Sequence, residues 1–110
     1  MQRVRIVRTK RYSRDLRAMG ASAKDIDELE RQIASHPQAG DVIPGLDGIR
    51  KLRFRLGHRG KRGGGRAVYF LMLDDDTAIM LFAYAKNERE DLTQQQKEAA
   101  LRLIKEMRDG

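Results

Sequence analysis

The chain has 110 residues, 40% of them apolar, which is enough for one domain with a single core. It has no cysteine and only two histidines, so disulfides and cysteine-based zinc sites are excluded and we expect neither a metal nor a cofactor. With 23 basic and 16 acidic residues the net charge is +7, which favours a polyanion or an acidic protein as partner. No apolar run approaches the roughly 20 residues of a membrane span, and the first residues do not resemble a signal peptide, so we expect a cytoplasmic protein without membrane attachment.

The N-terminal part of the chain predicts one strand and two helices. Apolar and basic residues alternate over Arg3–Arg8, which is typical of a short strand with one face toward the core. Apolar residues at helical spacing predict a helix over Lys10–Met19. Ser22 and Asp25 have the spacing of a capping box that begins a second helix, and Pro37 ends it. We expect a helical hairpin whose apolar stripes pack on a sheet, with an exposed groove for a partner as the alternative.

The densest cluster of charge lies in the stretch Gly48–Phe70, which follows an ordered loop predicted over His36–Asp47. Within the stretch, Lys51–Leu56 alternates basic and apolar residues with period two, which predicts a strand with one cationic and one apolar face. A glycine-rich loop is expected next, before another strand opens at Arg66. No acidic residue interrupts the basic cluster. Its eight members are Arg50, Lys51, Arg53, Arg55, Arg59, Lys61, Arg62 and Arg66.

Two apolar runs, Arg66–Leu73 and Thr77–Lys86, are separated by three aspartates and predict a β-hairpin. If the turn is centred on Asp75, residues whose numbers sum to about 150 lie opposite each other. The pairs expected from this register are Arg66 with Tyr84 and Val68 with Phe82. Arg66, Tyr84 and Lys86 would then share one face. A slip of one residue would move every side chain to the other face.

Each face of this hairpin needs its own cover. We expect one face under the helical hairpin, carrying Ala67, Tyr69, Leu71, Leu73, Ile79, Leu81 and Ala83. We expect the other face under a helix over about Gln94–Arg108, which has its own capping-box spacing and apolar stripe. This second face would carry Val68, Phe70, Met80 and Phe82. The predicted order is strand, two helices, three strands and a helix.

The residue types exclude several chemistries and favour one. Without cysteine, and with serines only beside helix boundaries, no nucleophilic triad is expected; the GxxG at Gly57–Gly60 is a weak match to a phosphate clamp because it lies between strands. RNA cleavage by its own 2′-hydroxyl needs only a base, an acid and positive charge on the phosphate. Crowded lysines and arginines can supply all three without a metal. The alternative for Lys51, Arg53 and Arg66 is a solvated cationic face.

Three segments together resemble one family of proteins. They are IRKLR at Ile49–Arg53, GKRGGGRAVYF at Gly60–Phe70 and YAKNEREDL at Tyr84–Leu92. This array is similar to the HigB branch of the RelE superfamily of toxins, and the resemblance covers nearly the whole chain as one domain, residues 1–110. It implies an α+β fold of the order β-α-α-β-β-β-α, with a small, mainly antiparallel sheet, a helical hairpin on one face and a C-terminal helix.

The resemblance also implies a function and partners. It implies the toxin of a type II toxin-antitoxin system, a metal-free, ribosome-dependent endoribonuclease that cleaves translated mRNA. Its partners would be the ribosome, mRNA and a cognate antitoxin, expected to be a helix-turn-helix protein of the HigA type. A non-catalytic basic module that binds nucleic acid or an acidic partner is the alternative.

Site residues follow from the same resemblance. Lys51 and Arg53 would form the basic pair, with Lys51 the better candidate base, and Arg66 would stabilise the phosphate. Lys86 falls where RelE proper has a lysine, but Asn87 replaces an arginine, so the general acid stays open. Tyr84 is assigned, on geometry, to the base stacking that a terminal tyrosine performs in RelE proper. Further RNA contacts are expected from Arg50, Arg55, Arg59, Lys61, Arg62 and Asn87.

Overall fold

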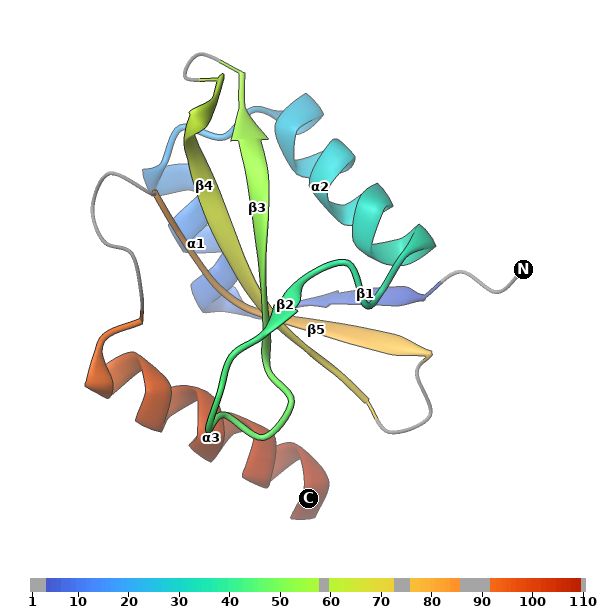
Figure 1. Ribbon diagram of the computed structural model, residues 1–110, viewed down its shortest axis with the longest axis vertical. Helices are drawn as coiled ribbons and strands as arrows, with labels where there is room; N and C mark the ends of the chain where they lie inside the picture. Colours follow the sequence, from blue (N-terminus) through green and yellow to red (C-terminus); the bar gives the residue numbers. More distant parts are fainter. Residues whose placement is uncertain (1–3, 58–59, 73–75, 86–91, 110) are drawn as a thin grey trace.

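The computed structural model describes residues 4–57, 60–72, 76–85 and 92–109 and has three helices and five strands within them (Figure 1). The elements are β1 (Arg5–Arg8), α1 (Lys10–Ala18), α2 (Ala23–Ser35), β2 (Asp41–Val42), β3 (Arg50–Leu56), β4 (Gly60–Leu71), β5 (Thr77–Ala85) and α3 (Gln94–Asp109). The strands form one sheet of order β1-β5-β4-β3-β2, in which only β1 and β5 are parallel. The predicted α+β class and its element order are confirmed, with β2 added. None of the helices in the described ranges is long and apolar enough to cross a membrane.

Both helices of the N-terminal hairpin begin at side-chain caps. The Thr9 hydroxyl accepts a hydrogen bond from the Tyr12 N–H at 3.2 Å, and it also donates to the Met80 carbonyl at 2.8 Å, so the cap ties α1 to β5. At α2 the predicted capping box is present: Ser22 and Asp25 each accept the other's backbone N–H. The hairpin is therefore fixed locally at both of its helix starts.

Two segments differ from the sequence expectation. The expected loop at His36–Asp47 contains the two-residue strand β2, which pairs with the edge of β3. The expected glycine-rich loop before Arg66 is largely strand, because β4 already begins at Gly60. Here glycine serves close packing: a Cβ at Gly65 would lie 2.7 Å from the Phe54 ring, which covers this point of the strand.

The register of β4 and β5 is as predicted over its first part only. Arg66 pairs with Tyr84, but a bulge after Val68 places Tyr69 opposite Met80, where the even register would have put Leu81. Leu81 is the extra residue, and the side chains that precede it in β5 lie on the faces opposite to those predicted. The predicted faces of Ile79, Met80 and Leu81 were therefore wrong: Met80 packs under the helical hairpin, and the other two pack toward α3.

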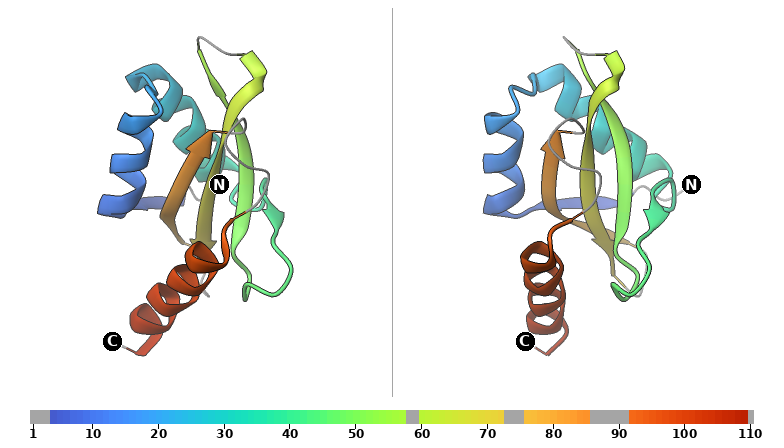
Figure 2. Two further views of the ribbon diagram at one scale, coloured as in Figure 1. Left: turned by 90° about the vertical axis from the view of Figure 1, so that its left-hand side faces the viewer. Right: turned by 60° about the vertical axis from the view of Figure 1, so that its left-hand side comes forward.

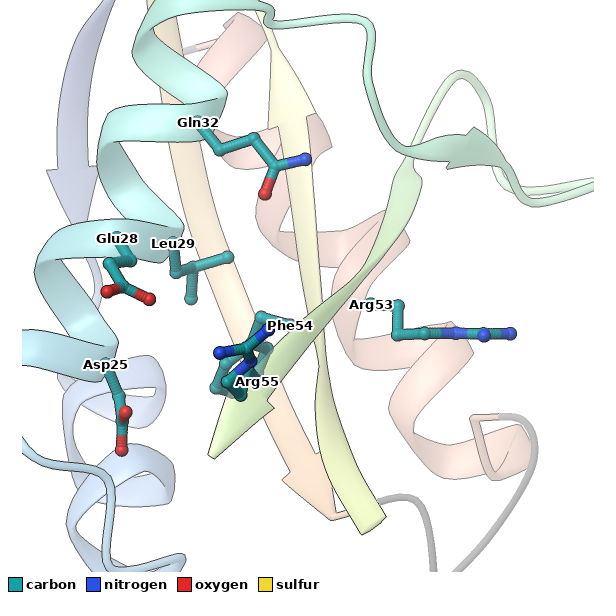
Figure 3. A pocket seen from close by; sticks show the side chains of 7 residues that line it. All are labelled: Asp25, Glu28, Leu29, Gln32, Arg53, Phe54 and Arg55. Carbon is teal, nitrogen blue, oxygen red and sulfur yellow. The ribbon is translucent and has the colours of Figure 1, made fainter. Parts of the chain in front are cut away.

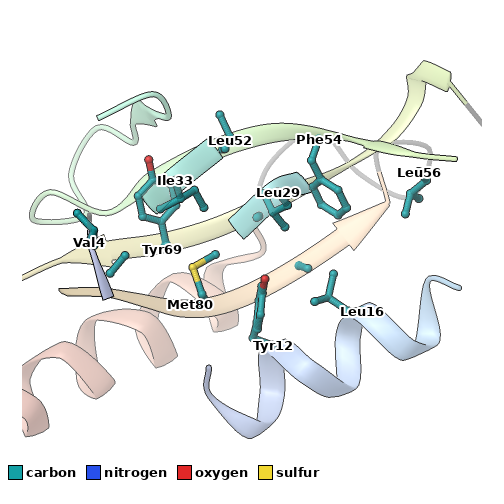
Figure 4. Packing of buried hydrophobic residues seen from close by; sticks show 13 residues of the cluster. Val4, Tyr12, Leu16, Leu29, Ile33, Leu52, Phe54, Leu56, Tyr69 and Met80 are labelled. Carbon is teal, nitrogen blue, oxygen red and sulfur yellow. The ribbon is translucent and has the colours of Figure 1, made fainter. Parts of the chain in front are cut away.

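The sheet has a hydrophobic core on each face. The core under α1 and α2 includes Tyr12 and Leu16 of α1, which point toward the sheet in Figure 4. The buried members of this core are Val4, Tyr12, Leu16, Leu29, Ile33, Leu52, Phe54, Leu56, Ala67, Tyr69, Ala78, Met80 and Ala83. The core under α3 consists of Leu46, Ile49, Val68, Phe70, Ile79, Leu81, Phe82, Tyr84, Leu92, Ala100 and Ile104. The predicted cover of both faces is confirmed.

A buried polar cluster joins β1, α1 and α2. Glu30 is 8% exposed and accepts hydrogen bonds from the Arg8 guanidinium at 2.6 and 2.8 Å and from the Tyr12 hydroxyl at 2.9 Å. Burial, together with the adjacent carboxylate of Glu30, raises the pKa of Tyr12. The same carboxylate raises the pKa of Arg8. The cluster holds the hairpin on the first strand of the sheet.

Candidate functional site

The centre of the candidate site is a row of three side chains across three neighbouring strands. Arg53 of β3 pairs with Arg66 of β4, which pairs with Tyr84 of β5. Directly opposite residues project from the same face with Cβ atoms about 5 Å apart. Lys51 lies two residues before Arg53 and therefore joins this face. Figure 3 shows the Arg53 side chain directed away from α2, on the side opposite the helical hairpin.

The two arginines of the row differ in their surroundings. Arg53 is exposed, whereas Arg66 is only 7% exposed, and its Nη1 donates to the Gly65 carbonyl at 3.2 Å. Arg66 forms no ion pair with any residue in the described part of the chain. Like charges directly opposite each other destabilise a sheet, and a desolvated cation without a carboxylate costs more still. The pair thus places an exposed and a buried guanidinium opposite each other on one face of the sheet.

Tyr84 lies at the predicted place, but its ring is covered. It is 4% exposed and belongs to the core under α3. Stacking of a nucleobase on this ring requires the neighbouring side chains to move aside. The row thus supplies two arginines that face the same way, with a covered tyrosine beside them.

Arg50 points to the other face of the sheet, apart from Lys51 and Arg53. It pairs with Tyr69, and its Nη1 donates to the Gly40 carbonyl at 2.7 Å and the Gln38 carbonyl at 3.3 Å. The Tyr69 hydroxyl accepts the Gly40 N–H at 3.0 Å and donates to a carbonyl of the same loop. Burial raises the pKa of Tyr69. The contacts described for Arg50 hold the loop before β2 in place.

The structure describes only some of the other residues that were predicted to contact RNA. Arg55 is exposed and lines a groove of about 390 Å³ between α2 and β3, opposite Asp25 and Glu28 (Figure 3). The backbones of Lys61 and Arg62 belong to β4, and their side chains lie outside the description. Arg59, Lys86 and Asn87 lie outside the described residues.

Asp25 has a tertiary role that the sequence does not predict. Its carboxylate, besides capping α2, accepts the Gly57 N–H at 3.1 Å and so ties the first turn of α2 to the end of β3. The capping-box spacing revealed the local bond. The bond to Gly57, 32 residues away, has no local sequence signal. Among the described residues no group of histidine or acidic side chains is suited to hold a metal ion.

Fold and site together define a small basic α+β protein with two arginines paired on a mainly antiparallel sheet. A family model described as the RelE toxin of the RelE/RelB toxin-antitoxin system matches residues 4–109. The chain therefore belongs to the RelE toxin family.

Solved structures agree in fold at low sequence identity. A mutant of the E. coli toxin RelE in the free state matches with a TM-score of 0.62 and 12% identity, over 94% of this chain and 99% of that one. A conserved hypothetical protein from Helicobacter pylori matches with a TM-score of 0.52 and 17% identity, over 77% of this chain and 97% of that one. The HigB branch within the family stays a prediction from the three sequence segments.

Proposed function

We propose that this toxin is a ribosome-dependent endoribonuclease that cleaves mRNA during translation. The observation that carries the proposal is the register that sets Arg53 opposite Arg66, with Lys51 on the same face of β3. Membership of the RelE toxin family supports the same reading. A site of this kind needs shape and positive charge more than a cofactor, because the RNA supplies its own nucleophile.

The proposed reaction is an in-line transesterification. The 2′-oxygen of the RNA attacks the adjacent phosphorus, and its proton passes to the general base, for which Lys51 is the candidate. Arg66 and Arg53 stabilise the charge that grows on the non-bridging oxygens. The bond from phosphorus to the 5′-oxygen breaks, and this oxygen leaves with a proton from a general acid, for which Lys86 is the candidate. The products are a 2′,3′-cyclic phosphate and a 5′-hydroxyl end.

Of the two arginines, Arg66 is assigned the larger electrostatic effect on the phosphate. A guanidinium that is 7% exposed acts in a medium of lower dielectric constant than water, so its effect on a phosphate is larger than that of the exposed Arg53. Its backbone position is set by β4, between two other strands, but its burial means that a phosphate contacts the guanidinium only after neighbouring side chains move aside. Tyr84, next to Arg66 in the row, would contact a base only after the side chains that cover its ring move aside.

We further propose that a cognate antitoxin keeps the toxin inactive. The family to which the chain belongs is defined by a toxin-antitoxin system. The finer expectation, a helix-turn-helix antitoxin of the HigA type, follows from the motif resemblance. Co-expression with the neighbouring reading frame, followed by co-purification, checks this partner: a helix-turn-helix protein that binds and restores growth is expected, and a neighbour that does neither contradicts it.

The function is tested with two site variants and one matched control. Lys51→Ala and Arg66→Ala should each remove growth inhibition on controlled expression, because they delete the base and the buried phosphate contact. Arg31→Ala, which removes an exposed cation from α2 together with its ion pair to Asp27, should leave inhibition intact. Circular dichroism checks that all three fold. Undiminished toxicity of both site variants contradicts the proposal.

A further inference from the structure

Asp41 lies on the face of the sheet that carries the candidate site. In the register of β2 and β3 it pairs with Lys51, and Lys51 shares its face with Arg53. Directly opposite residues of an antiparallel pair project from the same face, with Cβ atoms about 5 Å apart. The next residue, Val42, pairs with Arg50 and projects from the other face. A carboxylate therefore stands at the end of the cationic face.

The five strands of the described structure contain a single acidic residue, Asp41. It is exposed and forms no ion pair with any residue in the described part of the chain. A carboxylate repels phosphate, so a surface that served only to bind phosphate would be better without it. Ionised carboxylate oxygens are hydrogen-bond acceptors only. The ligand group that fits Asp41 is therefore a hydrogen-bond donor.

The backbone is held on both sides of Asp41. Before it, the Gly40 N–H donates to the Tyr69 hydroxyl at 3.0 Å. A Cβ at Gly40 would lie 2.9 Å from the same hydroxyl, so glycine permits this close approach. After β2, the Ile43 N–H donates to the Ile49 carbonyl at 2.8 Å. A side chain on a backbone fixed in this way presents its polar atoms to a ligand in a defined place.

Asp41 is close enough to the row of arginines to contact the same RNA strand. Its partner Lys51 lies two residues before Arg53, and β2 is the strand next to β3. With a rise of about 3.4 Å per residue and a strand spacing of about 4.8 Å, the backbones of Asp41 and Arg53 are about 8 Å apart. In both views of Figure 2, β2 lies on the flank of the sheet opposite α1. A nucleobase beside the scissile phosphate can span this distance.

We infer that Asp41 is a specificity-determining residue, whose carboxylate accepts hydrogen bonds from a guanine next to the cleaved bond. The inference rests on the proposed function and names the nucleobase that the site selects. Proteins read unstacked RNA bases on their Watson–Crick edges. Guanine presents two adjacent donors there, N1–H and the exocyclic amino group, which match the two oxygens of a carboxylate. Uracil presents one N–H between two carbonyl oxygens, which a carboxylate repels.

The test measures single-turnover cleavage on ribosomes programmed with mRNAs that differ only by guanine or uracil at each position of the presented codon. At one position the wild type should cut the guanine mRNA at least about fivefold faster, the lower limit for a bidentate base contact. In Asp41→Asn one acceptor becomes a donor, so this preference should fall below about twofold, while the rate with uracil stays within about threefold. Asp41→Glu retains the carboxylate and should retain the preference.

Glu28→Gln is the matched control. It removes one negative charge from an exposed residue of α2, on the side of the helical hairpin, and should leave the preference unchanged. The inference is overturned if the wild type shows no preference for guanine, if Asp41→Asn keeps it, or if Glu28→Gln loses it equally. An equal fall in rate for both nucleobases with a lower melting temperature would assign Asp41 to strand pairing with Lys51, and would overturn the inference as well.

Binding of single-stranded RNA requires no cleavage, so the two proposals can fail separately. Fluorescence anisotropy compares a short oligouridine with the same RNA carrying one central guanosine. A protein that leaves translated mRNA uncut, but binds the guanosine RNA more tightly only while Asp41 is present, contradicts the proposed function and retains the inference. A protein that cuts translated mRNA at equal rates with guanine and uracil does the reverse.

Discussion

Replacement of Arg66 by methionine should lower activity without lowering stability. The substitution removes a cation that is 7% exposed and whose one hydrogen bond to the described residues is the 3.2 Å bond to the Gly65 carbonyl. Loss of one preorganised donor to a charged transition state typically costs about 100- to 1,000-fold in rate, or about 3 to 4 kcal/mol. Exchange of a buried charge for an apolar side chain of similar length is commonly neutral or stabilising. We therefore expect an unchanged or higher free energy of unfolding.

The matched control is Arg50→Met, on the opposite face of the same sheet. It removes the donation to the carbonyls of Gln38 and Gly40, so we expect a loss of about 1 to 2 kcal/mol in the free energy of unfolding. Cleavage should stay within a few-fold of wild type, because the side chain points away from the row. Single-turnover cleavage on programmed ribosomes and urea unfolding give the two readouts. Cleavage by Arg66→Met within threefold of wild type, or a larger loss of cleavage in Arg50→Met than in Arg66→Met, contradicts the proposed role of Arg66.

Two further predictions concern the polar groups that hold the helices and the loop on the sheet. Glu30→Ala leaves the buried Tyr12 hydroxyl without its acceptor and removes the ion pair of the half-exposed Arg8. The free energy of unfolding, measured in urea melts, should therefore fall by about 2 to 3 kcal/mol, mostly through Tyr12. A loss below about 0.5 kcal/mol contradicts the role of this cluster. Because the pKa values of Tyr12 and Tyr69 are raised in the folded state, their contribution to stability is complete below about pH 10, where unfolded tyrosine titrates, and declines above it by up to about 1.4 kcal/mol per pH unit for each. Urea midpoints between pH 8 and 11 should therefore fall less steeply in the variant Tyr12→Phe, Tyr69→Phe than in wild type, and parallel curves would contradict the assigned shifts.

The sequence predicts those parts of the fold that depend on local patterns. The capping box at Ser22, the cationic strand β3 and the pairing of Arg66 with Tyr84 each follow from residues close together in the chain, and the structure has all three. The class of fold follows from the order of these elements. Once the register of the strands is known, it follows that Arg53 and Arg66 lie in one row.

What the sequence does not predict depends on contacts between distant segments. The bulge after Val68 reverses the faces of Ile79 to Leu81, and nothing in the apolar run Thr77–Ala85 marks it, since both faces of β5 are buried. The sequence suggests a loop before Arg66, because the Phe54 ring that packs on Gly65 lies on another strand. In the sequence, Arg50 and Arg53 are both members of one basic cluster. Only the fold shows that Arg50 bonds to the loop before β2, whereas Arg53 belongs to the candidate site.

The most direct test of the central claim is to map mRNA 5′ ends in cells after brief induction of the toxin and in a purified translation system with and without ribosomes. If the proposed function is correct, new ends with 5′-hydroxyl groups arise at fixed positions within codons, require ribosomes and disappear in Arg66→Ala. Binding of RNA with no new ends under any condition, while the folded protein is present, would contradict it and would support a non-catalytic RNA-binding module.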